Sequence, residues 1–249
     1  GMAREELLGF AEAAVKTGIA FDQTADQSGD MMAKWRTSFK LTQGGVETLA
    51  DKINYLGNTG PANTKQISDI VTRIGPLGEI AGLASGQIAA LGATMAGVGV
   101  EQDVAATGIK NFMLAMTKGS AATKDQALAF KALRLDAKTV AKSMQTDAQG
   151  AVLGILDRIK MVDKDKQAGL LSELFGTESI TAIAPMLTNL DLLKGNLQKV
   201  GDAQKYAGSM DKEYASRAAT TANNLQLLRN AAASVARAVG TALLPGINA

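Results

Sequence analysis

The chain has 249 residues with 26 basic and 24 acidic side chains, and it contains neither cysteine nor histidine. The absence of those two residue types excludes a disulfide framework, thiolate or imidazole metal sites, a Ser-His-Asp triad and a histidine general base. A formal charge of +2 is also too small for a protein that grips duplex DNA, so no specific nucleic-acid binding is expected.

Residues 1–42 are expected to form an N-terminal helical arm. An apolar stripe at helical spacing runs along residues 3–20, and its members are Leu7, Leu8, Ala11, Val15 and Ile19. A capping-box pattern from Thr24 to Gln27 then predicts a second helix, in which the lone Trp35 is a core or interface anchor. The acidic start at residues 3–6 predicts no secretory signal, and the two ends of the chain indicate a piece of a longer protein.

Residues 43–118 are expected to form a helical core rich in small side chains. Its middle, residues 80–100, has no charge and is long enough for a membrane span, yet five glycines and six alanines occur there. Two shorter buried helices are therefore favoured, the second starting near Ser85. Apolar stripes in this core supply five predicted packing or partner-contact residues, namely Ile88, Leu91, Met95, Ile109 and Phe112.

Residues 119–249 are expected to form a helical region that ends in a long amphipathic helix. Thr123 and Asp147 are predicted helix caps, Gly176 is a predicted helix end, and Pro185 is expected to kink or interrupt its helix. In the last helix, apolar and small residues alternate in steps of three and four from 218 to 242, a seam for its own chain or a neighbouring copy. Its predicted packing or partner-contact residues are Leu225, Leu228, Val235 and Val239.

These patterns predict an all-α fold, a multi-helix bundle of short to medium helices with Ala/Gly-rich packing and a longer C-terminal helix. They do not predict an enzyme. Residues 97–102 lack the last glycine of a dinucleotide-binding loop, and no phosphate-binding loop occurs. Two acidic pairs, Glu173 with Glu178 and Asp51 with Asp69, could in principle cleave glycosidic bonds, but helix capping and solubility already explain these acids. No cofactor or metal is expected.

Several short segments between residues 42 and 245 occur in an order and spacing that resemble the core region of phage tail tape-measure proteins. No single segment is specific, because all are short and rich in alanine. The segments are LAD at 49–51, LGAT at 91–94, AATGIKNF at 105–112, LSELFG at 171–176, AIAPML at 182–187, YAGSM at 206–210, NLQLL at 224–228 and ALLP at 242–245.

The resemblance implies a structural role in the tail of a phage or prophage. Proteins of this family occupy the tail tube during assembly, set the tail length and leave ahead of the DNA at infection. The partners it implies are other copies of the chain, tail-tube, tail-tip or assembly-chaperone proteins, and the host envelope on DNA entry. The implied location is the virion tail, assembled in the bacterial cytoplasm. The alternative is a peptidoglycan-degrading or membrane-inserting segment of a tail protein.

Overall fold

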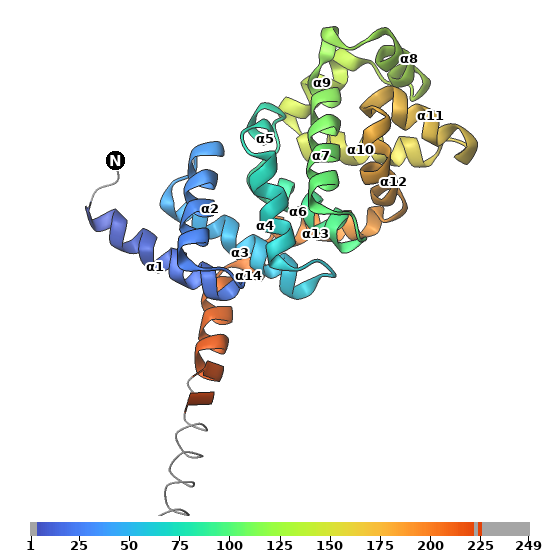
Figure 1. The fold of residues 1–249 in the computed structure, drawn as a ribbon. Helices are drawn as coiled ribbons and strands as arrows, with labels where there is room; N and C mark the ends of the chain where they lie inside the picture. The colour runs from blue at the N-terminus through green and yellow to red at the C-terminus, as the bar shows by residue number, and fades with distance from the viewer. Residues whose placement is uncertain (1–3, 222–223, 226–249) are drawn as a thin grey trace, which may run out of the picture. The chain divides into compact units, whose positions relative to one another are not determined.

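The computed structural model describes residues 4–221 and 224–225, and every regular element within them is a helix (Figure 1). This finding confirms the predicted all-α fold. The first α-helices are α1 (Arg4–Ala20), α2 (Ala25–Ser38), α3 (Gln43–Thr59), α4 (Thr64–Ile74), α5 (Leu77–Ile80), α6 (Ser85–Gly97) and α7 (Gln102–Thr117). They are followed by α8 (Lys124–Ala132), α9 (Ala137–Thr146), α10 (Ala148–Lys160), α11 (Lys164–Phe175), α12 (Ile180–Thr188), α13 (Leu190–Gly201) and α14 (Ala203–Tyr206).

Local capping explains where many of these helices begin. At Thr24, the side-chain oxygen accepts from the Gln27 amide at 3.2 Å while the Gln27 side chain accepts from the Thr24 amide at 3.1 Å. The same reciprocal pair forms at Asn63 and at Thr123, and Asp147 accepts from the Gly150 amide at 2.8 Å. Each cap satisfies an amide that the first helical turn leaves unpaired. The caps predicted at Thr24, Thr123 and Asp147 are confirmed.

Helix α6 lies at the centre of the fold, where it packs against α3, α4, α5, α7, α12 and α13. Almost every residue from Gly86 to Ala96 is buried, and a helix surrounded on all sides must be apolar all round. Its alanines and glycines let six neighbouring helices approach one short helix. This arrangement confirms the break before Ser85. None of the helices in the described part of the chain has the length and hydropathy needed to cross a membrane.

Proline 185 does not interrupt its helix. Helix α12 contains Pro185 and continues to Thr188, while residues 177–179 form a 3₁₀ turn before it. Of the two expected effects, the interruption is not found, and a kink at Pro185 stays a prediction. A proline removes one backbone hydrogen bond, and the burial of Ile183 and Met186 on either side of it supplies the compensating stabilisation.

The chain divides into a compact unit, Gly1–Met210, and a second unit, Asp211–Ala249. In the second unit, residues 211–221 and 224–225 are helical, and Arg217 pairs with Glu213 one turn before it at 2.7 Å. The division expected after residues 42 and 118 stays a prediction: α1 and α2 pack on α3 across the first of these boundaries, and α7 packs on α9 across the second.

The apolar stripe of α1 faces outward. Leu8 is 68% exposed, and Leu7, Val15 and Ile19 are also exposed. Helix α1 instead packs on α2 through a face of small residues, where Gly29 of α2 lies close to Ala14. Small side chains let α1 and α2 approach more closely than the large side chains of the apolar stripe would. The face of α1 with small residues is therefore the buried one.

The exposure of this stripe predicts that polar substitution there leaves stability almost unchanged. We expect Leu8→Gln and Val15→Gln each to change the free energy of unfolding by less than about 0.5 kcal/mol, because surface substitutions remove little buried area. Urea unfolding followed by circular dichroism measures this. A loss above about 1 kcal/mol would mean that the stripe is covered in the folded chain.

Candidate functional site

A carboxylate on α3 caps a segment that lies far along the chain. Asp51 accepts a hydrogen bond from the Gly208 amide at 2.9 Å with one oxygen and from the Met210 amide at 2.8 Å with the other. A helical stretch begins at Ser209. Amides at a helix start lack intrahelical acceptors, and a negative charge there is favoured by the helix dipole. Asp51 therefore acts as an N-terminal cap supplied by another helix.

Asn54, one turn after Asp51, holds the same segment. Its side chain is fully buried, and its Nδ2 donates to the backbone oxygen of Ser209 at 3.0 Å and to its hydroxyl at 2.9 Å. The backbone of Gly208 has φ +70°, a conformation that residues other than glycine rarely adopt. We call this contact, between Asp51, Lys52 and Asn54 of α3 and residues 206–210, the α3 anchor.

Lys52 completes the α3 anchor from the side. Its ammonium nitrogen lies 4.8 Å from the centre of the Tyr206 ring, within the range of a cation–π interaction. Partial burial lowers the pKa of Lys52 below 10.5, because removal from water disfavours the charged form. Lys199 donates to the Thr59 carbonyl at the end of α3 at 2.8 Å, and burial lowers its pKa as well.

The lowered pKa of Lys52 predicts an alkaline dependence of stability. The folded state releases the Lys52 proton at a lower pH than the unfolded state, so the unfolded state binds more protons in the range below 10.5. The free energy of unfolding of the parent should therefore rise with pH in that range, relative to Lys52→Met. Urea unfolding at several pH values tests this, and parallel pH curves for the two proteins would contradict it.

Two further contacts involve segments that the resemblance singled out. Gly108 of α7 lies against Ala182 of α12 so closely that a side chain at Gly108 would overlap the Ala182 methyl. Between α6 and α13, the buried Asn196 side chain donates to the Thr94 hydroxyl at 3.1 Å, and Thr94 donates to the Ala90 carbonyl at 2.8 Å. These contacts fix helix positions within the core.

The predicted contact residues fall into three groups. Ile88, Leu91, Met95, Ile109 and Phe112 are buried in the hydrophobic core of the first unit. The Phe112 ring packs against the Phe175 ring with their centres 4.8 Å apart. Leu225 is 53% exposed in the second unit, and three residues lie outside the described part of the chain, namely Leu228, Val235 and Val239. Contact of these residues with a partner stays a prediction.

The acidic pairs considered for hydrolysis have separate structural surroundings. Asp51 belongs to the α3 anchor, and Asp69 pairs with Lys65 at 3.6 Å. Glu178 accepts from Asn111 at 3.2 Å, whereas Glu173 lies on the exposed side of α11. Within the described residues, no group of three acidic side chains could hold a metal ion. The sequence analysis did not predict the α3 anchor. A signal for it was present, because the polar residues Asp51 and Asn54 lie next to the apolar positions of α3, where a buried polar contact could be expected.

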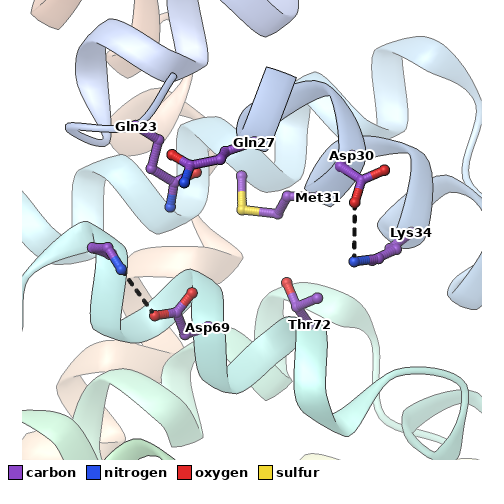
Figure 2. A pocket seen from close by; sticks show the side chains of 8 residues that line it. Gln23, Gln27, Asp30, Met31, Lys34, Asp69 and Thr72 are labelled. Carbon is purple, nitrogen blue, oxygen red and sulfur yellow. Dashed lines mark ion pairs between the residues drawn. The ribbon is translucent and has the colours of Figure 1, made fainter. Parts of the chain in front are cut away.

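A cleft between α2 and α4 is the polar pocket drawn in Figure 2, with a volume of about 270 Å³. On its two walls, Asp30 pairs with Lys34 at 3.2 Å and Asp69 with Lys65 at 3.6 Å. At its floor, the Thr72 hydroxyl accepts from the Trp35 indole at 2.8 Å. The two carboxylates are paired with lysines and the Thr72 hydroxyl with the Trp35 indole. These groups therefore do not point together toward one ligand position.

The chain is similar in sequence to known proteins. A family model described as phage-related minor tail protein matches residues 1–176. The chain belongs to this family. As a minor tail protein, it is also similar to a probable tape measure protein of Halomonas phage phiHAP-1, with 34% identity over 236 residues. The predicted resemblance is confirmed.

The alignment with this relative covers 95% of the chain and 27% of the relative. This minor tail protein chain therefore spans about a quarter of the length of the relative that it matches. No solved structure matches the chain.

Proposed function

We propose that the chain is a folded, non-enzymatic module of a phage tail tape-measure protein that acts in tail assembly and length determination. The observation that carries the proposal is the similarity to a probable tape measure protein together with a compact unit that extends to Met210. The α3 anchor closes this unit by joining Asp51 to Met210. A segment folded back in this way has a fixed shape suited to contacts with partner proteins.

The partners that fit this role are tail-tube, tail-tip or assembly-chaperone proteins and other copies of the chain, in the virion tail. A role in DNA delivery through the host envelope belongs to the same proposal. Support for a structural role comes from the side chains themselves. Asp51 and the Asn54 Nδ2 at the α3 anchor bind backbone groups, and Asn196 binds the Thr94 hydroxyl, as expected for a packing module.

An in-frame deletion of residues 43–118 from the gene for the full-length protein tests this function. It removes α3, α4, α5, α6 and α7, that is, the central helix α6 together with four of the six helices that pack on it. We expect absent or misassembled tails in electron micrographs, because the remaining helices lose the core on which they pack.

The matched control is a deletion of equal length elsewhere in the same gene, which is expected to leave tails that assemble. Tails shortened by roughly 110 Å on deletion of 43–118, about 1.5 Å for each helical residue, would mean that the region is extended in the tail and counts length. That result would contradict a folded module, and normal tails would contradict a role in assembly.

A further inference from the structure

The first unit has an acidic stretch and a basic stretch. Residues 4–30, in α1 and the first half of α2, contain six acidic and two basic side chains. Residues 110–142, from the middle of α7 into α9, contain seven basic and two acidic side chains. The formal charge of the whole chain is only +2, so opposite charges are concentrated in two separate places. We call residues 4–30 the acidic end and residues 110–142 the basic end.

The two ends lie apart in the fold. Helix α1 packs on α2 and α3, whereas α8 packs on α9 and α11. In Figure 1, α1 lies at the left of the first unit and α8 at its upper right. The acidic end of one chain therefore does not cover the basic end of the same chain.

The cations of the basic end are not neutralised by carboxylates. Asp136 accepts hydrogen bonds from two backbone amides at the start of α9, each at 3.0 Å, so its charge serves as a helix cap. Lys138 and Lys142 are one turn apart on α9, and like charges at this spacing repel. A negative surface placed against the basic end would relieve this repulsion. Five exposed cations of this end make no ion pair with any described residue, and they are Lys124, Lys131, Arg134, Lys138 and Lys142.

Exposed leucines lie among these cations. Leu128 is 54% exposed, and Lys124 and Lys131 lie one helical turn before and after it on α8. Leu114 on α7 is also exposed, and Lys118 follows it by one turn. The basic end therefore combines positive charge with apolar side chains.

The acidic end combines negative charge with the exposed apolar stripe of α1. Leu8 and Val15 are exposed on either side of Glu12, each about one helical turn from it. Among the described residues of the first unit, six of the eight exposed large apolar side chains belong to the acidic end or the basic end. Exposed apolar side chains that are rimmed by polar residues are typical of a protein-binding surface.

We propose that the acidic end of one copy of the chain binds the basic end of a second copy. This inference rests on the proposed function, in which other copies of the chain are among the partners. A second copy supplies both the negative charge that complements the basic end and the positive charge that complements the acidic end. A nucleic acid or an anionic membrane would complement the basic end alone and would leave the stripe of α1 uncovered.

The pairing that follows is head to tail. Two different surfaces meet, so each pair of copies keeps one free acidic end and one free basic end, to which further copies can add. Pairing of like ends is disfavoured, because complementary charges fix which surfaces meet and like charges repel.

Sedimentation equilibrium of the purified chain tests this association. We expect self-association in sodium chloride of about 0.1 M, where the Debye length is about 10 Å. In about 1 M sodium chloride, where this length is about 3 Å, the dissociation constant should rise at least about tenfold. Salt screens the attraction between exposed charges but does not weaken a purely apolar contact.

Two charge-reversed variants locate the association at the two ends. The acidic-end variant is Glu12→Lys with Asp26→Lys, and the basic-end variant is Lys124→Glu with Lys131→Glu. All four side chains are exposed. We expect each variant alone to associate at least about tenfold more weakly than the parent. An equimolar mixture should form pairs with one molecule of each, because the acidic-end variant keeps an intact basic end and the basic-end variant keeps an intact acidic end.

The matched control is Glu101→Lys with Asp191→Lys. These two exposed acids lie outside both ends, and their reversal changes the net charge by as much as the acidic-end variant does. We expect the dissociation constant of this control to equal that of the parent. Circular dichroism of each variant checks that the helices are retained.

Several results would overturn the proposal. They are a chain that stays monomeric at concentrations up to about 100 μM, association that salt does not weaken, a mixture that pairs no better than either variant alone, or an equal loss in the control. Failure of the proposed function is a separate result. It would appear as normal tails after deletion of residues 43–118, whereas sedimentation of the purified chain does not depend on tails.

Discussion

Replacing Gly108 by leucine is expected to lower the free energy of unfolding by about 3 kcal/mol, the upper part of the range for overpacked cores. The reason is the close crossing of α7 and α12. A side chain at Gly108 would overlap the methyl group of Ala182, which is fully buried. The obstacle is a short side chain fixed to a helix backbone, so only a shift of one helix can relieve the overlap.

The free energy of unfolding of Gly108→Leu in urea is compared with that of Gly154→Leu, which serves as the matched control. Gly154 lies on α10 with no atom near the place of its missing side chain, so leucine there should gain about 0.5–1 kcal/mol from helix propensity. The double variant Gly108→Ala with Ala182→Gly should restore most of the stability that Gly108→Ala loses. Equal effects of leucine at Gly108 and Gly154 would disprove the close crossing.

Replacing Asp51 by alanine is expected to cost about 2–3 kcal/mol, in the range for hydrogen bonds to a charged group. The variant leaves the Gly208 and Met210 amides without their acceptor and removes a negative charge from the start of a helical stretch. Asp51→Asn keeps one carbonyl acceptor and should fall between alanine and the parent. Amide hydrogen exchange at Gly208 and Met210 should speed up in both variants, because these amides lose their protection.

The matched control for Asp51→Ala is Asp69→Ala. Asp69 makes an exposed ion pair with Lys65 one turn away on α4, and such pairs contribute about 0.5 kcal/mol or less. If Asp51→Ala and Asp69→Ala destabilised the chain equally, and amide exchange at Met210 were unchanged, the α3 anchor would not stabilise the position of residues 206–210.

The helix pattern of this protein could be predicted because its signals are local. Thr24, Asn63 and Thr123 each bond to a residue three positions along the chain, so the cap and the helix that it starts lie in the same short window. The break before Ser85 was predictable for the same reason, since the small and polar residues of that stretch oppose one long helix. At Pro185 the local pattern left a kink or an interruption open, and the helix continues through this residue, where Ile183 and Met186 are buried.

The amino-acid sequence by itself determined the all-α class, the helix starts and the family resemblance. Only the tertiary structure decided the outward face of α1 and the α3 anchor. The face of α1 that is buried depends on how closely Gly29 of α2 can approach Ala14. The spacing of apolar residues within α1 alone carries no information about this approach. The anchor joins Asp51 to Met210 across 159 positions. No local pattern encodes such a pairing, because it depends on the packing of all the helices between them.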